Sequence, residues 1–324
     1  MRPCDDVQDE SLPAQQPVLA GEGHPSDRSR YIGAAFAAVA AVAFSGKAVI
    51  VKLAYRHGVD PVTLLALRMV FSAPLFLALG WWASSRDSAP ITASDRRSIF
   101  VLGMVGYYLS SYFDFLGLQH ITAALERLVL FLYPTFVMLL AAVFFKRRIT
   151  ARDVAALALS YVGIVFVFLN DLATQPGNVV AGSAWVMLSA LFYAAYLLGS
   201  GPLVQRVGSL RFASNAGLVS CVGVLIHFFI VSDARTLFGQ PAPVYWLAFL
   251  MAAVSTVMPI ALTSEGIRRI GASHASVIGS VGPIATIFLG FVFLDEAITA
   301  VQLLGAALVL AGVLTATLQR SARG

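Results

Sequence analysis

Charged side chains inside otherwise apolar stretches are the residues of this sequence that could do chemistry. Five of them interrupt long apolar runs: Lys47, Arg68, Asp114, Glu126 and Arg127. A charge at the centre of a membrane helix costs about 2.5 to 3.5 kcal/mol on insertion scales, so such groups tend to bind solutes, carry protons or pair with one another. Their formal sum is +1, which favours an anionic or zwitterionic solute, such as an amino acid, over a cation.

The adjacent pair Glu126 and Arg127 is the most informative. Glu126 and Tyr133 are seven residues apart and share one helical face, beside the helix break that Pro134 predicts. We expect Glu126 to pair with one of the three bases named above. Two interpretations remain open, because such a carboxylate either binds a substrate amine or a coupling proton, or forms an interhelical salt bridge.

Three tyrosines within the apolar runs, Tyr133, Tyr193 and Tyr196, are candidates for the wall of a pocket, and packing is the alternative interpretation. Lys52 stands at the end of the first apolar run, where a lysine is expected to snorkel toward water. The sequence has no phosphate-binding loop, His-Glu-x-x-His spacing or Gly-x-Ser-x-Gly elbow. We therefore expect neither an enzyme nor a metal or cofactor site.

Composition places these residues in a lipid bilayer. Hydrophobic residues make up 58% of the chain and charged residues only 12%, whereas about a quarter of the residues of a soluble protein are charged. Apolar runs of about 18 residues or more can cross the hydrocarbon core as helices. The sequence predicts an all-α integral membrane protein with ten transmembrane helices, near 31–53, 62–83, 98–117, 123–145, 152–169, 181–200, 212–232, 244–264, 273–294 and 300–318.

An internal repeat organises these ten runs. The stretch 117–167 matches 266–316 at a constant offset of 149 residues, with Gly117/Gly266, Pro134/Pro283 and Gly163/Gly312 among the pairs. We predict a disordered cytoplasmic tail over 1–30 and five-helix repeats over 31–169 and 181–319. Because five is odd, the second repeat must be inverted, an architecture that is common among secondary transporters.

Basic residues predict the orientation. Sixteen lysines and arginines fall on the side of the N-terminus, and only Arg56 and Arg235 fall on the other. Because basic residues collect on the cytoplasmic side, we expect both termini in the cytoplasm and the protein in the plasma (inner) membrane. The net charge of +5 reflects this orientation, so no nucleic-acid partner is expected.

Three motifs stand out in the membrane region: Phe44 to Lys52, Pro61 with Arg68, and Ser273 to Gly312 with Pro283, Glu296 and Gly305. Through them the membrane region as a whole resembles the EamA type of the drug/metabolite transporter superfamily. The resemblance implies a ten-helix carrier of small metabolites, often an exporter, with a central pathway between the first, third, fourth, sixth, eighth and ninth helices. The first half departs from the pattern, since Lys146 to Arg148 stand where the family often has an acidic residue.

The sequence thus predicts a secondary transporter that works by alternating access, with helix breaks at Pro134 and Pro283. Its partners would be a small-molecule solute, the lipid bilayer and, as an open alternative, a proton as coupling ion. A channel or a non-transporting membrane sensor shares the predicted topology and remains the alternative. The oligomeric state, the substrate and the direction of transport are left open.

Overall fold

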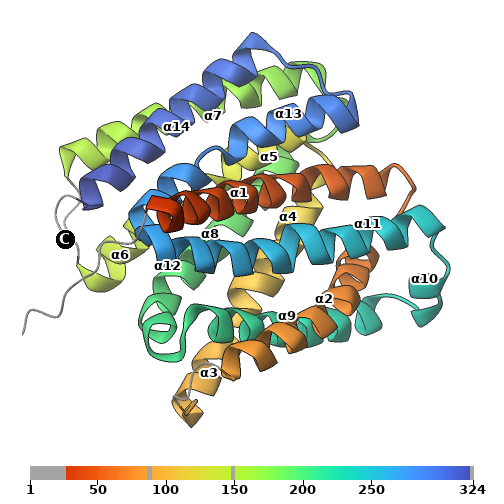
Figure 1. Ribbon diagram of the computed structural model, residues 1–324. Coiled ribbons are helices and arrows are strands. Elements are labelled where there is room, and N and C mark those ends of the chain that lie inside the picture. The colour runs from red at the N-terminus through yellow and green to blue at the C-terminus, as the bar shows by residue number, and fades with distance from the viewer. Residues whose placement is uncertain (1–26, 86–89, 147–149, 322–324) are drawn as a thin grey trace, which may run out of the picture.

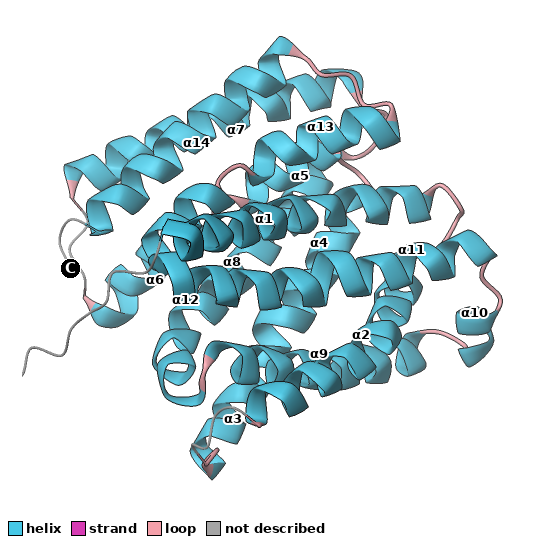
Figure 2. Ribbon diagram, in the orientation of Figure 1, coloured by secondary structure: helices cyan, strands magenta, loops and turns pink. Residues whose placement is uncertain are grey.

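The computed structural model describes residues 27–85, 90–146 and 150–321, and within these ranges the chain forms helices and no strand (Figure 2). The first repeat contains α1 (Asp27–Tyr55), α2 (Pro61–Ser84), α3 (Ala93–Leu102), the π-helical η1 (Gly103–Leu109), α4 (Ser110–Leu118), α5 (Ala123–Leu130), α6 (Tyr133–Phe145) and α7 (Ala151–Thr174). The second contains α8 (Val179–Val207), α9 (Ser209–Val231), α10 (Ala234–Phe238), α11 (Ala242–Ala252), the π-helical η2 (Ala253–Val257), α12 (Met258–Gly279), α13 (Gly282–Leu294) and α14 (Ala300–Ser321).

These elements combine into ten spans. In the described residues nine helical stretches are long and apolar enough to cross a membrane, and the shorter apolar helix Ala300–Thr315 follows them. The predicted all-α membrane fold is confirmed. Exposed side chains on the helices are largely apolar, among them Phe144, Ile230 and Phe288, as expected for surfaces that face lipid.

Several predicted boundaries differ from the structure by a few residues; the span predicted over 181–200, for example, is α8 (Val179–Val207). Helix α1 begins at Asp27, so its first four residues extend into the stretch predicted as tail, while the tail residues 1–26 lie outside the described residues. The predicted break between spans near 265–272 is found at Gly271, where φ is 79°, but α12 stays helical past the predicted span end at 264 as far as this kink. Glu265 stabilises this extension through ion pairs with Arg268 and Arg269, three and four residues further along the helix.

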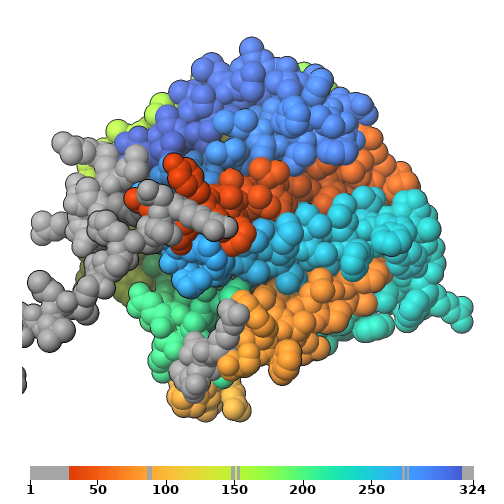
Figure 3. All heavy atoms as spheres, viewed as in Figure 1, coloured from red at the N-terminus to blue at the C-terminus, as the bar shows by residue number. Residues whose placement is uncertain are grey.

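The inverted repeats pack against each other as equivalent helix pairs. Helix α7 lies along its equivalent α14, and α2 along α9 (Figure 1). Helix α1 packs on α12 and α13, just as its equivalent α8 packs on α4 and α6. In the space-filling view α1, α11 and α12 lie side by side on one face (Figure 3). The symmetry therefore brings each first helix against the other repeat.

The contact between α7 and α14 shows the two-fold relation most directly. A Cβ atom on Gly163 would lie 2.5 Å from the Gly305 carbonyl oxygen, and one on Gly312 would lie 2.4 Å from the Ala156 oxygen. These two contacts are equivalent, since 163 and 156 become 312 and 305 at the offset of 149. Small residues at these positions let the two backbones touch, as in other membrane helix pairs.

Irregular backbone is duplicated as well. The π-helical segments η1 and η2 fall at matching positions, and so do the left-handed residues Lys146 (φ 52°) and Asp295 (φ 60°) that end α6 and α13. The helix before Pro134 is interrupted at Phe131–Leu132, and the helix before Pro283 at Ser280–Val281. Proline lacks a backbone N–H, but an N–H in the first turn of a helix has no partner within that helix. A new helix can therefore begin readily at a proline.

Replacing Gly163 with alanine should loosen the α7–α14 contact. The added Cβ has no room against the Gly305 oxygen, and overpacking typically destabilises by about 1 to 3 kcal/mol. We expect a lower thermal unfolding temperature for the purified protein. The control is Gly201→Ala, where a Cβ meets nothing within 4 Å and stability should be unchanged or higher. Equal unfolding temperatures for Gly163→Ala and the native protein would contradict this packing.

Candidate functional site

A three-residue ion cluster lies where α1, α4 and α5 meet. The Lys47 Nζ atom is 2.6 Å from Asp114 Oδ2 and 3.1 Å from Glu126 Oε1. The side chain of Lys47 is 16% exposed, that of Asp114 3% and that of Glu126 0%. Of the bases considered from the sequence, Lys47 is therefore the one that pairs with Glu126. We call Lys47, Asp114 and Glu126 the central cluster.

Local structure fixes the position of each member. Glu126 lies in the first turn of α5, where the N-terminal end of the helix dipole favours a negative charge. Thr122 caps that helix, since its hydroxyl accepts a hydrogen bond from the Leu125 N–H at 3.1 Å. On α1, the Ser45 hydroxyl donates to the Gly282 carbonyl at 2.9 Å, which ties the Lys47 segment to the start of α13 in the other repeat.

The cluster is incompletely satisfied. Asp114 Oδ1 and Glu126 Oε2 are buried and have no hydrogen-bond partner. One lysine faces two carboxylates, so the formal charge of the cluster is −1. A buried acceptor without a donor costs about 1 to 3 kcal/mol, and more when it is charged. The arrangement can accept hydrogen bonds from an ammonium group or a proton.

The two arginines of the predicted site lie beside the central cluster but outside ion-pairing distance of it, within the part of the chain that the structure describes. Arg68 is buried, with its guanidinium carbon 5.5 Å from the Phe115 ring and Nη2 3.4 Å from the Ser111 hydroxyl. Its Nε and Nη1 atoms have no hydrogen-bond partner. The Arg127 guanidinium lies over the Phe131 ring at 5.2 Å, and its Nε atom is also unpartnered.

The three predicted tyrosines form a continuous row with Tyr107 of η1. Ring centroids are 5.2 Å apart between Tyr133 and Tyr193, 5.9 Å between Tyr193 and Tyr196, and 5.4 Å between Tyr196 and Tyr107. Tyr196 belongs to an apolar core cluster, while Tyr133 and Tyr193 are half-buried. The row runs from α6 across α8 to η1, so it joins the two repeats. Packing accounts for Tyr196, and the other two rings remain candidates for a pocket wall.

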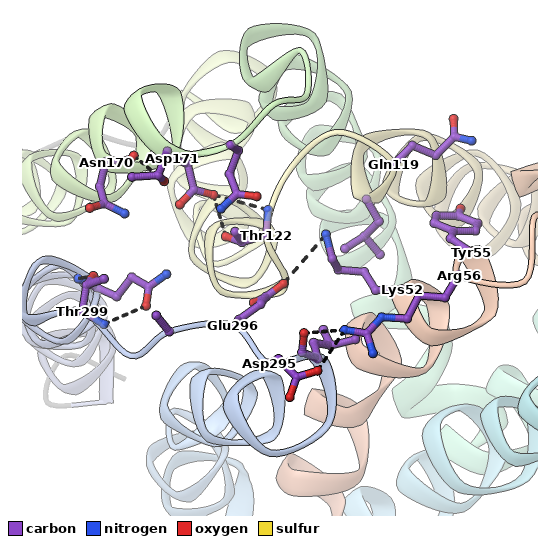
Figure 4. A pocket seen from close by; sticks show the side chains of 16 residues that line it. Lys52, Tyr55, Arg56, Gln119, Thr122, Asn170, Asp171, Asp295, Glu296 and Thr299 are labelled. Carbon is purple, nitrogen blue, oxygen red and sulfur yellow. Dashed lines mark hydrogen bonds and ion pairs between the residues drawn. The ribbon is translucent and has the colours of Figure 1, made fainter.

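A pocket of about 560 Å³ lies at the end of the bundle away from the termini, and sequence reasoning missed it (Figure 4). The signal was available, because the predicted orientation puts the ends of α1, α7 and α13 on one side, each with a charged residue. We call it the end pocket. Leu118, Leu294 and Ala297 contribute apolar surface to its lining, and the other lining residues carry polar groups: Lys52, Tyr55, Arg56, Gln119, Thr122, Asn170, Asp171, Thr174, Gln175, Asp295, Glu296, Thr299 and Gln302.

Ion pairs in the end pocket connect α1 to the α13–α14 loop. Lys52 donates to the Ile121 carbonyl at 2.7 Å and lies 3.8 Å from Glu296 Oε1, so its ammonium group extends into the end pocket and has protein partners there. Glu296 also accepts from the Ala123 N–H at 3.2 Å, at the start of α5. Burial raises the pKa of Glu296 above its usual range, whereas Lys52 and the Ala123 N–H oppose the rise.

Comparison with known proteins identifies relatives along the whole membrane region. The model of the EamA-like transporter family matches residues 31–169 and 180–318. The uncharacterized transporter YcbK of Bacillus subtilis (strain 168) is 30% identical over 296 residues, which cover 89% of this chain and 93% of that protein. A probable terminal-alkyne amino-acid exporter of Streptantibioticus cattleyicolor is 28% identical, over 80% of this chain and 84% of the exporter.

A solved crystal structure has the same fold. It aligns with a TM-score of 0.60 at 20% sequence identity and covers 92% of this chain and 99% of its own.

The unequal charges of the central cluster predict unequal effects of substitution. Lys47→Met leaves two buried carboxylates without a cation, and breaking a buried pair in this way costs about 3 to 5 kcal/mol. Glu126→Gln leaves the 2.6 Å Lys47–Asp114 pair, which is formally neutral, so the loss should be smaller. Thermal unfolding of the purified variants in one detergent measures the difference.

The matched control is Glu265→Gln, which removes a carboxylate that pairs with Arg268 and Arg269 near the terminal end of the bundle. Its unfolding temperature should stay near the native value. If Glu126→Gln lowers the unfolding temperature as much as Lys47→Met, the prediction that loss of the lysine is the more damaging change is contradicted.

Proposed function

This chain belongs to the EamA-like transporter family, and we propose that it is a secondary transporter of zwitterionic solutes of the amino-acid class. A transport role for small molecules follows from the family. The proposal adds the substrate class, the residues that bind it and the mode of transport. One observation carries it: Asp114 and Glu126 keep unpartnered carboxylate oxygens, Arg68 and Arg127 keep unpartnered guanidinium nitrogens, and Arg68 interacts electrostatically with Asp114 and Arg127 with Glu126.

An amino acid carries the two groups that complement this set. Its ammonium group would donate to Asp114 Oδ1 and Glu126 Oε2, the two acceptors that Lys47 leaves free. Its carboxylate would accept from Arg127 or Arg68, because guanidinium groups match carboxylates in planar, charge-assisted hydrogen bonds. Lys47 holds the two acids in place throughout, which keeps the site assembled when it is empty.

The tyrosine row supplies the apolar side of this site. Tyr133 follows the interruption at Phe131–Leu132, and the ring of Tyr193 lies against it from α8. An aromatic wall that is half-buried suits the side chain of an amino acid more than its charged groups. The proposed substrate therefore spans from the central cluster to the tyrosines.

Alternating access is the proposed mode of transport. It is supported by the pairing of inverted repeats and by the interrupted helices near Pro134 and Pro283, which place irregular backbone where a solute pathway would run. Ser45 links the two repeats at this level through its bond to Gly282. Rocking of one repeat against the other would expose the central cluster to each side in turn.

Export is the proposed direction, with both termini in the cytoplasm and the chain in the plasma membrane. Two observations support it. Sixteen basic residues against two favour this orientation, and a relative that is 28% identical carries the name of a probable amino-acid exporter.

Cells that express the native chain should differ in a few amino-acid-like solutes from cells that express a Lys47→Ala, Glu126→Gln double variant at matched membrane abundance. Untargeted measurement of small molecules inside and outside the cells tests this. Glu265→Gln serves as the control and should behave as the native chain, since it leaves the central cluster intact. Solute levels that are identical in all strains, over several growth conditions, count against a carrier.

Glu126 is also the proposed proton-coupling group, because it is the fully buried member of the cluster. With a substrate in hand, transport by the native protein should vary with pH, and Glu126→Gln should flatten the pH profile because glutamine cannot titrate. Initial rates in proteoliposomes between about pH 5 and 8 measure the profile. A native pH profile in this variant would contradict the coupling role of Glu126, but it would not contradict the proposed substrate site.

A further inference from the structure

The end pocket holds one carboxylate that its own bases do not neutralise. Lys52 Nζ is 3.8 Å from Glu296 Oε1, and Arg56 Nη2 is 3.6 Å from Asp295 Oδ2. These two pairs match two acids with two bases. Asp171 of α7 is the third acid of the lining and has no salt-bridge partner among the described residues.

Asp171 is fully buried, and only half of its carboxylate is satisfied. Oδ2 accepts the Thr122 hydroxyl at 2.6 Å and the Thr122 N–H at 3.3 Å. The Asn170 side chain interacts with this carboxylate, but Oδ1 has no hydrogen bond of normal geometry among the described residues. Its fixed half caps the α5 segment, so the free half is held in a defined direction (Figure 4).

We propose that the end pocket is a binding site for the ammonium group of a small solute, with Asp171 as its anionic anchor. The site does not depend on the proposed transport function. A cavity of about 560 Å³ lies within the range of about 300 to 1,000 Å³ for small-molecule sites. The rest of the lining is rich in amides and hydroxyls, which suit the polar remainder of such a solute: Gln119, Asn170, Thr174, Gln175, Thr299 and Gln302.

The chemistry of the lining favours an ammonium group over a divalent metal. Within the described ranges no group of three or more His, Cys, Asp or Glu side chains could hold a metal ion. An ammonium group needs only one anionic acceptor and a few neutral oxygens. Asp171 Oδ1 is itself buried, and the exposed side chains of Thr174 and Gln175 line the same pocket.

The site belongs to one end of the molecule only. At the repeat offset of 149 residues, Lys52, Thr122 and Asp171 correspond to Gly201, Gly271 and Arg320. The duplicated frame therefore carries the acid, the helix cap and the lysine in one copy and none of them in the other. A site required by the packing of the repeats would recur at both ends.

Binding of ethylammonium to the full-length protein in lipid nanodiscs tests the proposal. Calorimetric titration should give saturable binding, and Asp171→Asn should weaken it by about tenfold or more through loss of a charge-assisted hydrogen bond. Asp295→Asn is the matched control, because it removes an acid of the same pocket that is 89% exposed and should leave the affinity within about twofold.

Thr174→Lys provides a second test that does not alter Asp171. Residue 174 lies one turn from Asp171 on α7, so the new ammonium group would fill the site from within. Ethylammonium binding should then be lost. Native affinity in this variant, or in Asp171→Asn, would place the ligand elsewhere and overturn the proposal.

Titration with sodium chloride at constant ionic strength distinguishes an inorganic cation from an ammonium group. Sodium should compete weakly or not at all with ethylammonium. Sodium binding that depends on Asp171 while ethylammonium does not bind would reassign the site to an alkali cation and contradict the ammonium assignment.

Discussion

The central constraint on this molecule is that one lysine must neutralise two carboxylates inside a membrane bundle. Lys47 reaches Asp114 of α4 and Glu126 of α5 from α1, so three helices of the first repeat converge on a single Nζ atom. Isolated buried charges are strongly disfavoured in such surroundings. Helix α1 is held by both repeats. Two residues before Lys47, the Ser45 hydroxyl donates a hydrogen bond to the Gly282 carbonyl of the second repeat. The ion cluster and the contact between repeats therefore depend on the same turn of helix.

The two repeats share their helix packing, but they differ in their buried charged residues. The close glycine contacts, the π-helical segments and the helix interruptions recur at a fixed offset. The charges do not: the positions equivalent to Lys47, Asp114 and Glu126 are Tyr196, Thr263 and Ala275. Where one repeat has the lysine, the other has a tyrosine of the aromatic row. The two copies therefore kept their packing, while the buried charges of the central cluster are confined to the first repeat.

Much of this architecture could be predicted from the sequence because its causes are local. Apolar length marked the ten spans, and the fixed offset of paired glycines and prolines marked the repeats. The charged residues of the central cluster were found because each is unusual within its own helix. Their pairing was not determined, since helical periodicity gives the face on which Glu126 lies but not which of Lys47, Arg68 or Arg127 faces it.

The features that sequence analysis predicted wrongly or missed also have physical explanations. The continuation of α12 past residue 264 was missed because Glu265 and its two arginine partners have the hydropathy of a polar loop, whereas in the helix they pair with one another. The end pocket was missed because Lys52, Asp171 and Glu296 come from three distant segments. Each looks like an ordinary charge at the end of a span, and only the packing of α1, α7 and the α13–α14 loop brings them together.

The proposed function requires that the protein exchanges zwitterionic solutes across a membrane. The most direct measurement is counterflow in proteoliposomes: vesicles loaded with an unlabelled amino-acid mixture are diluted into a labelled mixture, and label uptake is followed. An alternating-access carrier predicts saturable uptake that is faster with amino acids inside than in empty vesicles. Uptake that never saturates and ignores the internal solute would indicate a channel. Uptake no higher than in protein-free vesicles would contradict the proposed substrate class.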